Sequence, residues 1–323
     1  SGNGVANVTA PGFVLAANTF DPPTGKHFTA WDIGSPASTY YWNPAADAGT
    51  TKQAVARWAG NAGTITYDKN ADDATGTTAS TEYVYDSTST LASCGFTRTG
   101  YTFNGWYTAR TGGTKLDTAS KIKTAFPAGS GTVFAHWNAN TYTVSYAGMS
   151  GANHGTNHPE SATYDNTFTV NNPTKTGYTF TGWDITGMDS VTHTYGSNTT
   201  TGTSISGTKA TSFKNLKSTS GTVTFTAGWS KDTYTISYNL NDSSGSTRAT
   251  HSNPKTSYQV DTDTFTLVNP TRTGYTFAGW TGSNGTTAQT SVSITKGSTG
   301  NKSYTANWTA NTYSISYAGI EGA

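Results

Sequence analysis

This sequence of 323 residues has little charge, almost no sulfur and no long apolar run. Only 11% of its residues are charged and the formal net charge is +1, which gives nucleic acid or an anionic membrane no electrostatic hold. One cysteine, Cys94, cannot form an intrachain disulfide. No stretch is apolar over the length of a membrane span, and Ser1 begins no signal-peptide pattern. Aromatic cores must therefore hold the chain together.

Aromatic residues are abundant, and they recur in a fixed phrase. The residues between them are mainly Thr, Ser, Asn and Gly, a composition typical of strands and turns. The phrase reads TRTGYTFNGW up to Trp106, TKTGYTFTGW up to Trp183, TRTGYTFAGW up to Trp280 and, more weakly, PPTGKHFTAW up to Trp31. Four copies in one chain predict a tandem repeat protein.

Alternating strands flank this phrase in each full repeat. An opening strand reads TYTVSY at 141–146, TYTISY at 233–238 and TITYD from Thr64, and a closing strand ends at a second tryptophan, as in TVTFTAGW. Eight of the nine tryptophans thus take two fixed positions, which predicts that they are core residues: Trp31, Trp58, Trp106, Trp137, Trp183, Trp229, Trp280 and Trp308. The predicted domains are residues 1–58, 59–137, 138–229 and 230–308, followed by a terminal strand at 309–323.

The repeats differ mainly between their two tryptophans. The second repeat has KLDTASKIKTAFP there, which predicts a short helix capped by Asp117 or Thr118 and stopped by Pro127. The third has a Thr- and Ser-rich insertion from Met188 to Ser220, for which we expect an extra hairpin or a lid. The glycine before the aromatic of each phrase is expected to have a positive φ.

No motif for catalysis or metal binding stands out. Asp68, Asn70, Asp72 and Asp73 resemble the start of a calcium loop, but Asp73 replaces the required glycine and Ala79 the required glutamate, which favours a turn. His154 and His158 lie in a loop beside Gly and Pro, where solvated histidines are expected. We therefore predict no enzyme, no cofactor and no metal site.

The second repeat carries a family resemblance. Its segment GYTFNGWYTARTGGTKLDTASKIKTAFPAGSGTVFAHW resembles the Listeria–Bacteroides repeat, also called the internalin B-type B repeat, of bacterial surface proteins. The third and fourth repeats share the GYTFxGW and TAxW signatures but lack the GGTK segment, and the first matches loosely. The resemblance implies a small β-grasp-like module of four strands with at most one short helix, found in extracellular adhesins and stalks. It implies no catalytic residues.

The two ends of the sequence complement each other. The first repeat lacks an opening strand, whereas NTYSISYAGIEGA at 311–323 supplies one with no repeat after it. When the end of one copy is placed before the start of the next, Trp31 lies 37 positions after Tyr317. Trp183 likewise lies 37 positions after Tyr146. We predict a donor strand and an acceptor module, which join head to tail in an open filament. The donor residues are Tyr313, Ile315 and Tyr317, and the acceptor residues are Phe28, Trp31 and Trp58. The alternatives are one super-repeat of a continuous chain, or an expressed fragment.

The resulting hypothesis is a mainly β chain, a tandem array of four small β-grasp-like modules whose first module is completed by a strand from another copy. Its function would be that of a secreted or cell-surface structural subunit, with other copies as partners and no nucleic acid or inserted membrane. The alternative is a bacterial surface adhesin or stalk that binds a host receptor or glycan. Either the 188–220 insertion or the aromatic loop Tyr40, Tyr41 and Trp42 would make that contact.

Overall fold

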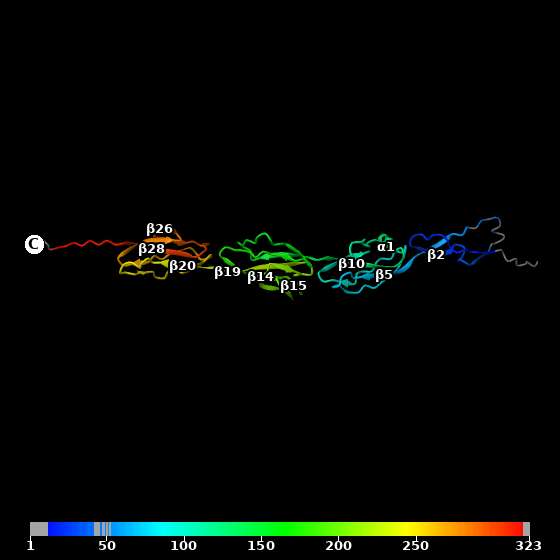
Figure 1. Cartoon of the computed structure of the whole chain (residues 1–323), viewed down its shortest axis with the longest axis horizontal. Coiled ribbons are helices and arrows are strands. Elements are labelled where there is room, and N and C mark those ends of the chain that lie inside the picture. Colours follow the sequence, from blue (N-terminus) through cyan, green and yellow to red (C-terminus); the bar gives the residue numbers. More distant parts are fainter. Residues whose placement is uncertain (1–11, 42–45, 47–48, 50, 52, 319–323) are drawn as a thin grey trace, which may run out of the picture. The chain divides into compact units, whose positions relative to one another are not determined.

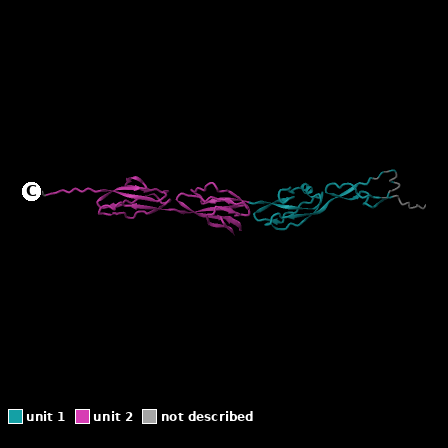
Figure 2. Ribbon diagram, in the orientation of Figure 1, with its two compact units in different colours: residues 1–140 teal, residues 141–323 magenta. Residues whose placement is uncertain are grey.

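The structure is a computed structural model that describes residues 12–41, 46, 49, 51 and 53–318 (Figure 1). The chain forms two compact units, residues 1–140 and 141–323 (Figure 2). The described residues are mainly β, with the short α1 (Ala119–Ala125) as their one helix. None of their helices has the length and apolar character needed to cross a membrane.

The second repeat shows the basic sheet. Its order is β7-β5-β10-β9, in which β5 and β10 are parallel neighbours and each outer strand is antiparallel to the strand beside it. The opening and closing strands thus form the centre of the sheet, and a short ladder pairs β6 with β8. The strands are β5 (Ala62–Asp68), β6 (Thr75–Gly76), β7 (Thr81–Val84), β8 (Phe96–Thr97), β9 (Tyr101–Tyr107) and β10 (Gly131–Ala139).

The third repeat has the same sheet with a fifth strand, in the order β12-β11-β19-β14-β17. Its insertion contains the predicted hairpin, in which β15 pairs antiparallel with β16. A second sheet has the order β13-β18-β15-β16. The strands are β11 (Thr141–Ala147), β12 (Ser161–Thr163), β13 (Phe168–Thr169), β14 (Tyr178–Thr186), β15 (Val191–Tyr195), β16 (Asn198–Gly202), β17 (Ile205–Thr208), β18 (Ser212–Lys214) and β19 (Thr222–Lys231).

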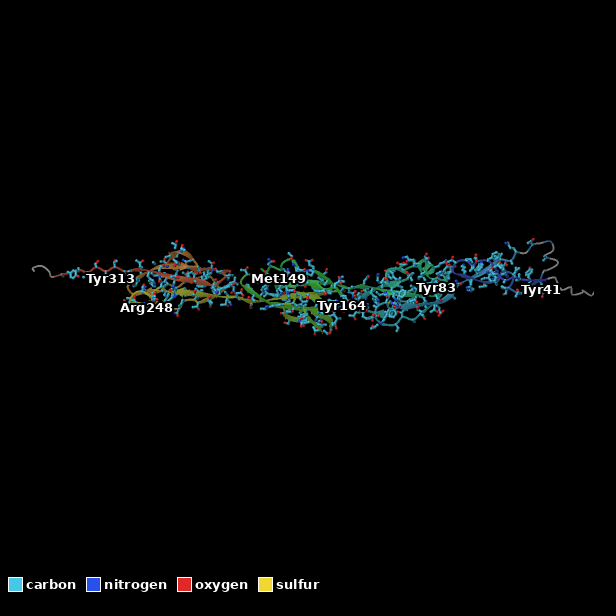
Figure 3. The ribbon with its side chains drawn as sticks, viewed as in Figure 1. Tyr41, Tyr83, Met149, Tyr164, Arg248 and Tyr313 are labelled. Atoms are coloured by element: carbon cyan, nitrogen blue, oxygen red, sulfur yellow. The ribbon has the colours of Figure 1, made fainter. Side chains whose placement is uncertain are left out.

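The fourth repeat has the order β22-β20-β28-β25-β26, again with opening and closing strands parallel at the centre. Two short ladders pair β21 with β24 and β23 with β27. The strands are β20 (Thr233–Asn239), β21 (Ala249–Thr250), β22 (Ser257–Gln259), β23 (Phe265–Thr266), β24 (Thr271–Arg272), β25 (Tyr275–Gly282), β26 (Gly285–Gln289), β27 (Ser293–Ile294) and β28 (Lys302–Ala310). Residues 311–318 follow β28 and form no strand. Tyr313 lies on this segment, beyond the strands of the repeat (Figure 3).

The first repeat contains only part of this sheet. Here β2 (Lys26–Trp31) pairs antiparallel with β4 (Ala56–Gly60), as the phrase strand pairs with the closing strand elsewhere. A separate ladder joins β1 (Gly12–Val14) to β3 (Thr39–Tyr41). Among the described residues no strand lies parallel to β4.

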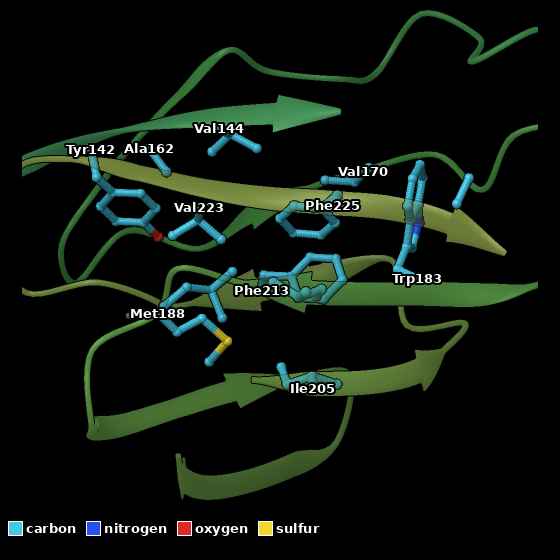
Figure 4. Packing of buried hydrophobic residues seen from close by; sticks show 13 residues of the cluster. Tyr142, Val144, Ala162, Val170, Trp183, Met188, Ile205, Phe213, Val223 and Phe225 are labelled. Atoms are coloured by element: carbon cyan, nitrogen blue, oxygen red, sulfur yellow. The ribbon is translucent and has the colours of Figure 1, made fainter. Parts of the chain in front are cut away.

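A separate hydrophobic core fills each of the second, third and fourth repeats. In the third repeat Trp183 and Phe225 meet residues of the insertion, among them Phe213 and Ile205 (Figure 4). Phe213 and Leu216 are fully buried there. The insertion therefore belongs to the core. Of the two structures expected for it, an extra hairpin or a lid, the structure shows the hairpin.

Local structure follows the sequence at two predicted positions. The Thr118 side chain accepts a hydrogen bond from the Lys121 backbone N–H and caps α1, which ends ahead of Pro127. The glycine of each phrase has a positive φ, with values of 78° at Gly25, 79° at Gly100, 76° at Gly177 and 79° at Gly274. Both predictions are confirmed.

Candidate functional site

A triplet of aromatic rings recurs in all four repeats. The phenylalanine of the phrase packs edge-on between the two tryptophans, with centroids 4.9–5.3 Å from the first and 5.5–5.8 Å from the second. The first tryptophan is buried in each repeat and the second is half-buried. The phenylalanines are Phe28, Phe103, Phe180 and Phe277. The predicted acceptor residues Phe28, Trp31 and Trp58 thus form one contact group.

A tyrosine from the opening strand adds a further ring in the three complete repeats. Its centroid lies 4.7 Å from the buried tryptophan for Tyr67 and Trp106, 6.0 Å for Tyr146 and Trp183, and 5.4 Å for Tyr238 and Trp280. In the first repeat Trp31 contacts Phe20 and Phe28, which correspond to the Phe96 and Phe103 rings around Trp106. Among the described residues no tyrosine takes the remaining place beside Trp31.

The second tryptophan also depends on the opening strand. Its indole N–H donates to the backbone carbonyl one residue after that strand: Trp137 to Lys69 at 2.9 Å, Trp229 to Gly148 at 2.9 Å and Trp308 to Leu240 at 2.7 Å. No described residue accepts a hydrogen bond from the indole of Trp58. An opening strand would supply that acceptor.

The inner face of β4 is correspondingly less covered. Ala56 is half-buried. Its counterparts two residues before the second tryptophan, Ala135, Ala227 and Ala306, are exposed by 0%, 7% and 0%. Since their cover includes the parallel opening strand, the described part of the first repeat has an unpaired edge of β4 beside a partly exposed apolar face. Such an edge invites pairing with another strand.

The predicted donor residues are the most exposed large apolar side chains described. Tyr313, Ile315 and Tyr317 are exposed by 78%, 77% and 80%. Their counterparts on β11 include Tyr142 and Val144, which are exposed by 3% and 2%. The segment therefore has the alternating apolar residues of a core strand, but these side chains are exposed.

The acidic turn of the second repeat is occupied by protein partners. Asp68 accepts a hydrogen bond from the Asn70 backbone N–H at 2.7 Å and pairs with Arg110, while Asp73 pairs with Arg98 at 2.8 Å. The described residues contain no group of three or more His, Cys, Asp or Glu placed to hold a metal ion. These contacts support the turn interpretation.

The two loop histidines stack on each other, with ring centroids 4.7 Å apart. His154 also packs against Tyr146 and Trp183, which places it at the edge of the core. Burial, together with the neighbouring His158, lowers the pKa of His154. The expectation that both histidines are solvated is therefore wrong for His154, which is half-buried. In the aromatic loop Tyr41 is 59% exposed, while Trp42 lies outside the described residues.

Sequence comparison identifies the repeats. The Listeria-Bacteroides repeat domain matches residues 64–136, 142–206 and 234–314, which together make up more than half of the chain. The chain belongs to this family. A stretch of 88 residues is also 41% identical to part of internalin H from Listeria monocytogenes serovar 1/2a (strain ATCC BAA-679 / EGD-e). That stretch is 27% of this chain and 15% of internalin H. No solved structure is significantly similar to the chain.

One feature that recurs in all four repeats was not predicted from the sequence. An Asn or Asp follows each closing strand, and its backbone N–H donates to the carbonyl of the phrase glycine in the same repeat. These boundary residues are Asn61, Asn140, Asp232 and Asn311. The signal is visible in the sequence as ANTY at the start of β11, as KDTY at the start of β20 and as ANTY again at 310–313. Its meaning appears only when the partner glycine is known.

Proposed function

We propose that this chain is a structural protein of the bacterial cell surface or exterior, built from Listeria-Bacteroides repeats, whose copies join head to tail by donating a strand. The observation that carries the proposal is the ring cluster around Trp31, to which the described residues contribute Phe20 and Phe28 but no tyrosine. The other repeats complete that cluster with an opening-strand tyrosine, and Tyr317 occupies the same position in the exposed segment. Family membership and the match to internalin H support a surface location.

The donated strand would enter parallel to β4. It would give the first repeat the parallel centre that β5 and β10 form in the second repeat, together with a ring against Trp31 and a carbonyl near Trp58. A strand order with a parallel pair at the centre and antiparallel strands outside also agrees with a β-grasp-like module. The proposed role is mechanical, and the comparisons indicate no catalytic family.

The burial of Ile315 gives a scale for the strength of this joint. Full burial of an isoleucine side chain stabilises by about 1.5–3 kcal/mol. Tyr313 and Tyr317 would each add an aromatic surface that is now almost fully exposed. Strand addition provides backbone hydrogen bonds as well, and the alternate side chains give it specificity.

A charge on the buried face of the strand tests the proposal. Ile315→Asp is expected to weaken assembly by at least about 30-fold, because it loses about 2 kcal/mol of burial and places a carboxylate in the core. Ser314→Asp is the matched control, since its counterpart Thr143 is exposed and the charge would face solvent. Sedimentation and electron microscopy of the full chain would measure assembly, and denaturing mass analysis would show that the subunits are separate. Equal assembly of both variants, or a covalently continuous chain, would contradict the proposal.

A surface adhesin is the second candidate, and one observation favours it. Within the described residues the β15–β16 hairpin belongs to the third repeat alone, and four of the five residues of β16 are exposed. Binding of the chain to a host glycan or receptor that is lost when this hairpin is shortened would favour adhesion over a purely mechanical role.

A further inference from the structure

Every repeat fixes the direction in which its chain leaves. The boundary residue donates its backbone N–H to the phrase glycine carbonyl at 2.8 Å for Asn61 and Asn140, and at 3.0 Å for Asp232 and Asn311. In the last three repeats its side-chain Oδ1 also accepts a hydrogen bond from a threonine hydroxyl, at 2.6 Å from Thr102 and Thr179 and at 2.7 Å from Thr276. We call this contact the exit clamp. It holds the first residue of the linker against the preceding repeat.

The same glycine also contacts the following repeat at two junctions, between the first and second repeats and between the third and fourth. Each of these junctions lies within one compact unit. A Cβ built on Gly25 would lie 2.4 Å from the ring of Tyr85, and a Cβ on Gly177 would lie 2.6 Å from the side chain of Val260. Tyr85 follows β7 and Val260 follows β22, so both come from the turn after the edge strand that pairs with the opening strand of the incoming repeat. The close approach leaves no space for a side chain on either glycine.

An ion pair accompanies each of these contacts. The residue after Tyr85 is Asp86, which pairs with Lys26 of the preceding repeat at 3.1 Å. The residue after Val260 is Asp261, which pairs with Lys231 of the preceding repeat. Two junctions with unrelated linker sequences thus use the same arrangement, a glycine facing an apolar side chain next to an aspartate.

The fourth repeat has the glycine and the exit clamp of such a junction, but the described residues contain no following repeat that contacts them. Asn311 is held in the exit clamp like the other boundary residues. Gly274 has a φ of +79°, and no described atom lies within 4 Å of the point that a Cβ would occupy there. The repeat itself therefore leaves space for a side chain at this glycine. Tyr275 and Ala310 occupy the places of Lys26 and Lys231, so neither lysine of the occupied junctions has a counterpart at this end.

We propose that the Gly274 end of the fourth repeat is a docking surface for a repeat of a second copy of this chain, the one that receives residues 311–318. The incoming repeat would place an apolar side chain against Gly274, as Tyr85 and Val260 are placed against Gly25 and Gly177 at the occupied junctions. The inference rests on the strand donation proposed above and adds a second contact to it. Strand donation joins the copies, and the docked glycine fixes their orientation.

Gly274→Asn tests the docking surface without disturbing the free chain. Asparagine tolerates a positive φ better than other residues with a side chain, and the space around Gly274 is open. Gly300→Asn is the matched control, because Gly300 has a φ of +80° and the same open surroundings. Both variants are expected to keep the thermal unfolding midpoint of the wild type. Only Gly274→Asn is expected to raise the concentration needed for assembly, by about tenfold or more.

A labelled peptide of residues 311–323 separates this inference from strand donation. The peptide reports strand addition alone, and we expect it to bind the wild-type chain and Gly274→Asn with equal affinity. Wild-type assembly by Gly274→Asn would overturn the docking surface and leave strand donation intact. Failure of the wild type to assemble or to bind the peptide would overturn both proposals. Equal loss of assembly in both variants would also contradict docking at Gly274.

Discussion

At the scale of single residues, the phenylalanine of the phrase contacts both tryptophans of its repeat. Phe180 meets Trp183 at 5.3 Å and Trp229 at 5.6 Å, both edge to face. Aromatic pairs of this geometry contribute about 0.5–1.5 kcal/mol each beyond the burial of their surface. One ring thus links the phrase strand β14 to the closing strand β19, which explains why the spacing FxxW recurs.

Replacement of this ring should be costly. Phe180→Ala is expected to lower the free energy of unfolding of the third repeat by about 3 kcal/mol, because it leaves a cavity between the two tryptophans. Urea unfolding followed by tryptophan fluorescence would measure the loss. The neighbouring Thr181→Ala, at an exposed position, should change it by less than about 0.5 kcal/mol. Similar values for the two variants would refute the linking role of Phe180.

At the scale of elements, the alternation of apolar and polar residues was sufficient to predict the opening and closing strands of the second, third and fourth repeats. Val223 and Phe225 on the inner face of β19 are fully buried, as their spacing indicates. The helix was also predictable, because Thr118 and Pro127 mark its ends locally. The parallel pairing of opening and closing strands was not, since nothing local in TYTVSY or TVTFTAGW encodes which strand lies beside it. The same holds for the exit clamp, whose threonine lies 35 to 53 positions before the boundary residue.

The opening strands also make the fold sensitive to alkali. Burial raises the pKa of Tyr142 on β11 and of Tyr238 on β20 from 10.0 to about 12. The folded state therefore favours the neutral phenol, so the stabilisation is complete below pH 10 and is lost as the pH rises from about 10 to about 12. Denaturant unfolding at pH 9 and pH 11 would measure this loss.

Tyr142→Phe provides the control for the alkaline effect. The Tyr142 hydroxyl is buried and makes no hydrogen bond of regular geometry with the described residues, so its removal should cost little at pH 7 and reduce the loss at pH 11. Phenol absorbance offers an independent reading, because the buried tyrosines should ionise only above the range of exposed ones. Ionisation of every tyrosine near pH 10 in the folded chain would contradict the account.

At the scale of the whole molecule, we expect every repeat to need an opening strand at one fixed register. In the three complete repeats, the residue just before the last tyrosine of the opening strand faces a residue of the closing strand, five positions before the second tryptophan. The facing pairs are Thr66 with Thr132, Ser145 with Thr224, and Ser237 with Ser303. In the first two pairs the hydroxyl oxygens are 2.9 and 2.8 Å apart. The same register places Ser316 of one copy opposite Gln53 of the next.

Disulfide trapping at this position tests the claim most directly. In a Cys94→Ser background, Ser316→Cys with Gln53→Cys should form disulfide-linked ladders on a denaturing gel, because facing residues of paired strands lie within disulfide reach. Ser314→Cys with Gln53→Cys is two residues out of register, about 7 Å away along the strand, and should remain monomeric on the same gel. A ladder from the first pair alone is the predicted result. No ladder from either pair, or equal ladders from both, would contradict donation of this strand to the first repeat.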